Sequence, residues 1–180
     1  FGALLKDHID KILEKPVFIA AIMLAGGIVL LFVDKWFNNP TTDKPEEISN
    51  KQAFAIGCYQ VLSVVLSGLS RSAATIIGGM QQKLTRRLAA EFSFFLAVPT
   101  MLAATVKSLW DMYQETPELL DTGNLNTLLL GSGIAFVVAI LAIKFFISFL
   151  QKYGFRLFGW YRIIVGIVLL ILIFMKVIPA

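Results

Sequence analysis

The chain has 180 residues, of which 57% are hydrophobic and only 16% are charged, and its mean hydropathy is +0.77. Soluble domains carry about 25% charged residues, so this composition excludes an ordinary water-soluble fold and predicts a helical integral membrane protein. The net charge of +4 is interpreted as lysine and arginine gathered in cytoplasmic loops. These residues are scattered between apolar segments, which argues against a nucleic-acid partner.

The chain begins at Phe1, and its first residues lack the basic region, the short apolar stretch and the small-residue cleavage site of a signal peptide. No signal peptide is therefore expected. Such a start is typical of the middle of a longer chain. Residues 3–15 have apolar side chains at helical spacing and charged ones between them. This pattern predicts an amphipathic helix at a membrane surface or the end of a preceding span, with the only histidine, His8, on its polar face.

Four apolar segments are long enough to cross a bilayer core, which needs about 20 residues. Between them the sequence predicts an exposed polar loop at 37–51, basic loops at 81–87 and 149–156, and an acidic loop at 107–125. The positive-inside rule places the basic loops in the cytoplasm and the acidic loop and the C-terminus outside. The predicted spans are residues 16–36, 88–106, 126–148 and 157–178.

Residues 52–80 differ from these spans because a polar Gly/Ser segment interrupts the apolar run. Neither piece is long enough to cross the membrane alone, so the pattern predicts two short helices meeting in a re-entrant hairpin. Non-helical backbone at membrane depth is stable only where it is buried in protein or lines a wet cavity. The segment Ser70-Arg71-Ser72 is therefore predicted to line a cavity.

Arg71 carries the strongest functional signal, because an arginine within a membrane segment is costly unless it is paired or hydrated. Its planar guanidinium suits two-point binding of phosphate oxygens, and nearby hydroxyls with a helix N-terminus would complete a phosphate cradle. The alternative is an interfacial arginine that extends to water beside serine caps. The predicted phosphate-binding residues are Gly68, Ser70, Arg71, Ser72 and Thr75.

Glu91 is the second ionisable residue inside a span. It is interpreted as a divalent-cation ligand or a partner of Arg71, and the alternative is an ion pair with Arg86 or Arg87 near the interface. Gln60 and Tyr59 could hydrogen-bond across the hairpin, although capping or packing explains them equally well.

Lys144 and Arg162 are expected to extend to the membrane surface from the ends of their spans, and Cys58 is expected to pack as a small hydrophobic residue. The chain has no zinc motif, P-loop or dinucleotide fingerprint. No residue stands out as a general base or as a histidine nucleophile.

Two motifs resemble the undecaprenyl-diphosphate phosphatase family of the bacitracin-resistance type. They are SRSAATIIGGM at residues 70–80 and AEFSFFLAVPT at 90–100, and QAFAIGCYQ at 52–60 and the pair Tyr161-Arg162 are similar as well. The resemblance covers nearly the whole chain. It implies a multi-pass enzyme of the bacterial inner membrane that converts undecaprenyl diphosphate to undecaprenyl phosphate and phosphate, which recycles the lipid carrier of cell-wall assembly.

By this resemblance Ser70, Arg71 and Thr75 are catalytic, and Gln60 and Glu91 support the site. The implied cofactor is Mg²⁺ or Ca²⁺ with its main ligands outside this chain, and Glu91 is the one candidate ligand within it. The implied fold is an inverted repeat with two re-entrant hairpins. The implied partners are the polyprenyl diphosphate, the bilayer, a preceding segment of the same protein and a second copy in a homodimer.

The sequence departs from the family pattern in two places. Ser67 stands where the family has proline, and residues 61–66 are one residue longer than usual. The family's glutamate-rich first motif, ending in Ser-Ser-Thr-Gly-His, is absent. Residues 1–180 are therefore predicted to form one membrane domain that is the C-terminal two-thirds of a longer enzyme.

Two other functions compete with hydrolysis. Broken helices around a site in the membrane are typical of transporters, so a lipid-phosphate flippase is the main alternative. A purely structural membrane subunit is the third hypothesis, and it predicts that Ser70 and Arg71 tolerate substitution.

Overall fold

The structure is a computed structural model that describes residues 15–116 and 122–178, and this part of the chain is predominantly helical. The amphipathic helix predicted at 3–15 and the placement of His8 lie outside the described residues, apart from Lys15. The elements are α2 (Pro16–Trp36), the short 3₁₀ helix η1 (Pro45–Glu47), α3 (Asn50–Val65), α4 (Arg71–Gln81), α5 (Arg86–Glu115), α6 (Thr122–Tyr153) and α7 (Arg156–Phe174).

Four of these helices, α2, α5, α6 and α7, are long and apolar enough to cross a membrane, which confirms the predicted all-α polytopic fold. The predicted loop at 107–125 is wrong over much of its length, because α5 continues to Glu115 and α6 begins at Thr122. The predicted loop at 149–156 is also too long, since α6 continues to Tyr153. A helix can extend beyond the hydrocarbon core into the headgroup region, and no glycine or proline interrupts residues 107–116.

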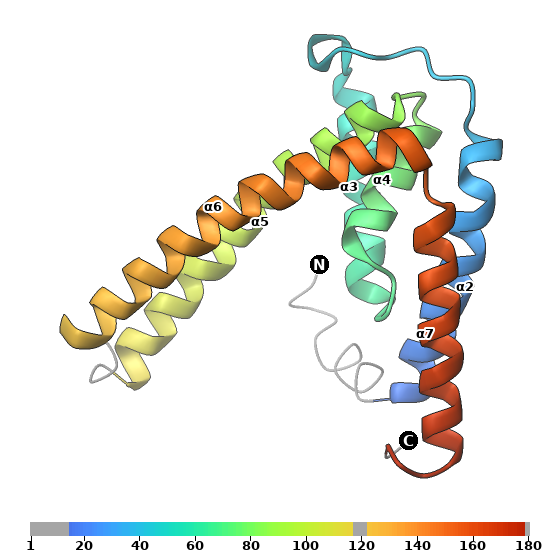
Figure 1. The fold of residues 1–180 in the computed structure, drawn as a ribbon. Coiled ribbons are helices and arrows are strands. Elements are labelled where there is room, and N and C mark those ends of the chain that lie inside the picture. The colour runs from blue at the N-terminus through green and yellow to red at the C-terminus, as the bar shows by residue number, and fades with distance from the viewer. Residues whose placement is uncertain (1–14, 117–121, 179–180) are drawn as a thin grey trace.

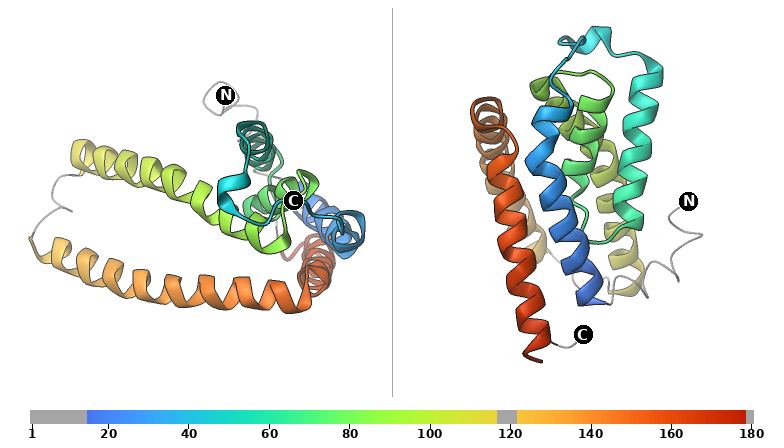
Figure 2. Two further views of the ribbon diagram at one scale, coloured as in Figure 1. Left: turned by 90° about the horizontal axis from the view of Figure 1, so that it is seen from above. Right: turned by 90° about the vertical axis from the view of Figure 1, so that its right-hand side faces the viewer.

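The helices form two groups (Figures 1 and 2). Helices α2 and α7 stand side by side, and α3 and α4 lie next to them, whereas α5 and α6 run together away from this group. The turn between α4 and α5, the turn between α6 and α7 and the C-terminal end of α2 all lie at the same end of the molecule (Figure 1). We call this the basic end, because Lys83, Arg86, Lys152 and Arg156 lie in or beside the two turns.

Glycines allow α2 and α7 to pack closely. A Cβ atom built on Gly27 would lie 3.0 Å from the carbonyl oxygen of Gly159, and one built on Gly159 would lie 2.9 Å from that of Gly27. Gly166 approaches Ala20 in a similar way, with a built Cβ 3.3 Å from its carbonyl oxygen. Small residues at such contacts let helix backbones approach each other in a membrane, where the lipid offers no hydrophobic drive for association.

An ion pair and a hydrogen bond join three helices at the basic end. Asp34, near the end of α2, pairs through Oδ1 with Arg86 Nη2 at 2.8 Å, and its Oδ2 accepts a hydrogen bond from the N–H of Phe155 at 2.8 Å. Gly154, with φ +68, leaves room for this carboxylate between α6 and α7. Asp34 therefore ties α2 to the beginnings of α5 and α7.

The segment after α2 is attached to the turn between α4 and α5. Thr42 forms a bridge with Leu84, and its carbonyl accepts the N–H of Thr85 at 2.9 Å. Gln52, which takes part in the capping box of α3, donates to the Gln82 carbonyl at 2.8 Å. The predicted exposed loop at 37–51 is thus mostly exposed but fixed at Thr42, and its last residues, from Asn50, already belong to α3.

The buried core lies near the basic end, where α2, α3, α4 and α5 meet the end of α6 and the beginning of α7. Outside it, large apolar side chains such as Phe54, Phe95 and Phe174 are exposed, as expected of surfaces that contact lipid. Cys58, expected to pack as a small hydrophobic residue, is exposed on α3. The core residues are Leu30, Val33, Ile56, Ile76, Met80, Leu84, Leu88, Ala89, Ala90, Leu150 and Phe155.

Candidate phosphate-binding site at a break between two helices

The site is built on a five-residue elbow, residues 66–70, that separates α3 from α4. Gly68 has φ +90, a backbone conformation that residues with a Cβ rarely adopt. A Cβ on Gly68 would also lie 2.6 Å from the carbonyl oxygen of Ile19 on α2. The elbow therefore needs glycine for its backbone conformation and for its contact with α2, and the predicted pair of short helices is present.

Ser70 ends the elbow and caps α4. Its Oγ accepts the N–H of Ala73 at 3.3 Å, so one of the four N–H groups left free by the first turn of a helix is satisfied. Arg71 is the first residue of α4, where backbone N–H groups and the helix dipole favour an anion.

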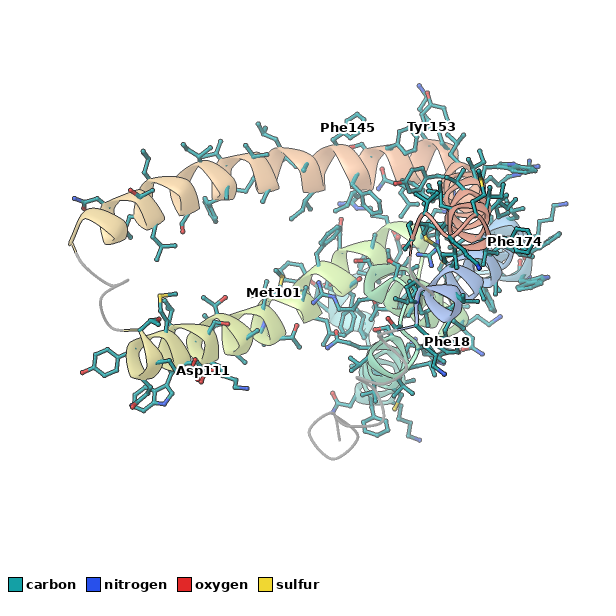
Figure 3. The ribbon with its side chains drawn as sticks, turned by 90° about the horizontal axis from the view of Figure 1, so that it is seen from below. Phe18, Met101, Asp111, Phe145, Tyr153 and Phe174 are labelled. Carbon is teal, nitrogen blue, oxygen red and sulfur yellow. The ribbon has the colours of Figure 1, made fainter. Side chains whose placement is uncertain are left out.

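The guanidinium of Arg71 lies at the edge of an apolar cavity of about 620 Å³ between α5 and α6. Arg71 Nη1 donates to Thr100 Oγ1 at 3.4 Å, a long hydrogen bond to the residue after Pro99. Figure 3 shows Met101, which lines this cavity, on the side of α5 that faces α6, whereas Phe145 points away from α5. The cavity is lined by Arg71, Glu91, Phe94, Phe95, Ala97, Val98, Met101, Ile143 and Ile147.

Glu91 lines the same cavity, but its carboxylate is bound elsewhere. Its Oε1 accepts a hydrogen bond from Arg87 Nε at 2.7 Å, an ion pair between residues one helical turn apart. This is the alternative that the sequence left open for Glu91. Within the described ranges there is no group of three or more His, Cys, Asp or Glu side chains that could hold a metal ion.

Thr75 lies behind the elbow and not at its surface. It is 1% exposed, and its Oγ1 lies 2.6 Å from Ser93 Oγ on α5 and 3.0 Å from the carbonyl oxygen of Arg71. The hydroxyl is thus engaged in holding the first turn of α4 against α5. The spacing of Ala89, Ser93 and Ala97 on one face of α5 was the sequence signal for this contact, but sequence reasoning assigned Ser93 no part in it.

The two arms of the hairpin are joined by Tyr59 and not by the side chain of Gln60. The Tyr59 hydroxyl donates to Gln81 Oε1, and its ring packs where a Cβ on Gly78 would lie 2.7 Å away. Gln60 contributes its backbone carbonyl, which accepts a hydrogen bond from Ser63 Oγ at 2.7 Å.

Arg162 was expected to extend to the membrane surface, and the structure contradicts this prediction. Its guanidinium points inward and donates from Nη2 to the Gly68 carbonyl at 2.5 Å and from Nε to the Met23 carbonyl at 3.4 Å. Arg162 also lines a second cavity of about 330 Å³ together with Ser70 and Ser72. Lys144, the other residue expected to extend, is exposed on α6.

Ser70, Arg71 and Ser72 thus line cavities, as predicted, but two of them. Ser70 and Ser72 line the smaller cavity with Arg162, and Arg71 lines the larger one with Glu91. Because Ser70 and Ser72 line one cavity and Arg71 lines the other, the start of α4 lies between them, and Phe94 on α5 lines both.

These features define a class of helical, multi-pass membrane proteins with a broken helix pair that presents an arginine and a helix N-terminus to an apolar cavity. The chain belongs to the family described as Bacitracin resistance protein BacA, whose sequence profile matches residues 1–168.

Curated relatives agree with this assignment. The undecaprenyl-diphosphatase of Flavobacterium johnsoniae is 54% identical over 174 residues, which cover 96% of this chain and 65% of that protein. The undecaprenyl-diphosphatases of Porphyromonas gingivalis (50% identical, 95% and 60% covered) and Bdellovibrio bacteriovorus (41% identical, 96% and 65% covered) are also similar. The chain thus spans between 60% and 65% of the length of these three relatives.

Proposed function

We propose that this protein takes part in hydrolysing undecaprenyl diphosphate to undecaprenyl phosphate and inorganic phosphate, which returns the lipid carrier to cell-wall synthesis. The observation that carries the proposal is the position of Arg71. It begins α4 at a helix break, and its guanidinium borders an apolar cavity of about 620 Å³. An arginine within a membrane segment is energetically costly unless it is paired or hydrated, and such a residue therefore marks a functional site by default.

The shape and chemistry of this cavity suit an amphiphile. A polyprenyl diphosphate has a highly charged head and an apolar chain, and the cavity combines one guanidinium with phenylalanine, valine, methionine and isoleucine side chains. The exposed apolar surfaces of α5 and α6 continue from the cavity toward lipid, so a long chain need not be enclosed.

In the proposed reaction an oxygen from water forms a bond to the terminal phosphorus. The bond from that phosphorus to the bridging oxygen breaks, and its electron pair stays with the lipid phosphate. Arg71 and the N-terminal N–H groups of α4 stabilise the negative charge on the phosphoryl oxygens. A base must take up one proton of the water, and the described residues include no histidine to do so.

Mg²⁺ or Ca²⁺, the cofactor implied by the family resemblance, does not fit the described residues. Glu91 is paired with Arg87, and no group of three potential metal ligands surrounds it in the described part of the chain. No step is therefore assigned to a metal here. We propose that metal-binding carboxylates, and the base, belong to the part of the relatives' length that this chain does not span, and that a homodimer is a further level of assembly.

The protein is proposed to lie in the bacterial inner membrane with its basic end in the cytoplasm. The elbow packs against Ile19, in the first turn of α2, and Arg162 links it to the Met23 carbonyl one turn further on, so it lies away from the basic end (Figure 1). This supports a site that opens toward the outer face of the membrane.

The test is phosphate release from farnesyl and undecaprenyl diphosphate by the protein purified from its own membranes. Arg71→Ala should abolish release, because the remaining groups at the site are uncharged or negative apart from Arg162, which is bound to the elbow. Arg156→Ala, which removes an exposed arginine on α7, is the matched control and should keep full activity. Wild-type rates in Arg71→Ala would remove the basis of the proposal.

The flippase alternative is supported by the broken helix pair itself, a common feature of transporter sites. Sealed vesicles that report lipid translocation and phosphate release in parallel separate the two functions. Translocation of undecaprenyl phosphate without any release from the diphosphate would favour transport.

A further inference from the structure

Arg162 lies within the apolar helix α7, six residues after its start at Arg156, and although it is only half-buried its donors face protein. It is directed to two backbone carbonyls, those of Gly68 in the elbow and Met23 on α2, at 2.5 and 3.4 Å. Neither bond was suggested by the sequence, because Gly68 and Arg162 are 94 positions apart.

Two glycines on α2 make room for this side chain. A Cβ on Gly26 would lie 3.2 Å from Arg162 Nη2, and one on Gly27 would lie 3.1 Å from Arg162 Cβ. The guanidinium therefore passes over a glycine pair to reach the elbow. Any side chain at position 26 would compete with it for space.

The elbow needs such a donor. Between α3 and α4 the backbone leaves its helical hydrogen-bond pattern, and a carbonyl without a partner at membrane depth is strongly unfavourable. A charged donor bonds a carbonyl more strongly than a neutral one. Gly68 precedes Ser70 by two residues and Arg71 by three, so a fixed Gly68 carbonyl restricts where α4 begins and how Arg71 is presented.

We propose that Arg162 is a positioning residue that holds the elbow against α2 and thereby fixes Arg71 and the N-terminus of α4 for phosphate binding. Its effect on catalysis rests on the proposed hydrolase function. The docking of the elbow by Arg162 does not, and it can be measured without any substrate.

The elbow is probed with a single cysteine at position 69, made as Leu69→Cys in a Cys58→Ser background, in the protein from its own membranes. The rate of labelling by a membrane-impermeant maleimide reports how freely the elbow moves. Arg162→Met should raise this labelling rate several-fold. Arg162→Lys should raise it less, because lysine keeps one charged donor. Gly26→Ala should also raise it, because the added methyl group displaces the guanidinium. Arg156→Met, which removes an exposed arginine from the same helix, is the matched control and should leave the rate unchanged.

Kinetics with farnesyl diphosphate complete the test. We expect kcat/KM to fall roughly tenfold or more in Arg162→Met and to recover in part in Arg162→Lys. If Arg162→Met does not yield folded protein, Arg162→Lys and Gly26→Ala carry the comparison.

An unchanged labelling rate in the folded variants would overturn the docking role, whatever their activity. A raised rate with unchanged kcat/KM would overturn the positioning role. A raised rate in a protein whose wild type releases no phosphate would leave the docking role standing and reject the proposed function instead.

Discussion

Arg71 and Thr100 are joined by a hydrogen bond of 3.4 Å from Nη1 to Oγ1, which attaches the first residue of α4 to α5 just after Pro99. Proline has no N–H for the carbonyl four residues earlier, so α5 lacks one backbone hydrogen bond at this point. Thr100 itself bonds back to the Ala97 carbonyl at 2.8 Å. The long bond from Arg71 leaves most of the guanidinium's donors available to a ligand in the cavity.

The two-point geometry of Arg71 should matter as much as its charge. Arg71→Lys keeps the charge but replaces a planar fork with a single ammonium group, so we expect kcat/KM for a polyprenyl diphosphate to fall by about tenfold or more. Arg156→Lys, at an exposed position, is the matched control. Equal kinetics in Arg71→Lys and wild type would mean that Arg71 acts only as a point charge.

Thr75 and Ser93 should behave as a coupled pair. Thr75→Val leaves the Ser93 hydroxyl without its buried partner and should destabilise the protein by about 1–3 kcal/mol, whereas Thr75→Ser should cost less. Adding Ser93→Ala to Thr75→Val should cost little more, because both polar groups are then removed. The free energies of unfolding of the single and double variants in detergent give the coupling, and strict additivity would contradict the pair.

Asp34 should stabilise the junction at the basic end. Asp34→Ala removes the partner of Arg86 and the acceptor of the Phe155 N–H, so we expect a loss of about 1–3 kcal/mol of stability. Thermal unfolding in detergent measures the loss. Asp111→Ala, at an exposed position on α5, should leave the unfolding temperature unchanged, and an equal effect of the two substitutions would show that the junction has no special role.

The same substitution, glycine to alanine, should have different effects on two helices. Gly27→Ala places a methyl group 3.0 Å from the Gly159 carbonyl and should destabilise the α2–α7 contact by about 1–3 kcal/mol. Gly131→Ala on α6 meets nothing within 4 Å and should be neutral or stabilise the helix by up to about 1 kcal/mol. Thermal unfolding distinguishes them, and equal shifts would contradict close packing at Gly27.

The sequence by itself determined the features that depend on local chemistry. Hydropathy located the four spanning helices, and α2 was predicted to the residue because Pro16 begins it and Asp34, Lys35 and Trp36 mark its end. The polar residues around Gly68 identified the break between α3 and α4, since a short apolar segment cannot cross a bilayer. The presence of an arginine at that break made Arg71 the leading candidate for phosphate binding.

Only the tertiary structure decided which side chains meet. The inward turn of Arg162 to Gly68 joins segments 94 positions apart, and nothing local in the chain indicates it. The burial of Thr75 against Ser93 depends on how α4 packs on α5, and the small residues on one face of α5 indicate a close contact there without naming its partner. The sequence also placed the ends of α5 and α6 too early, since charged residues can continue a helix outside the hydrocarbon core. The physical reason is the same in each case: local composition sets where a helix is stable, whereas the direction of a polar side chain depends on which backbone groups the neighbouring helices leave without a partner.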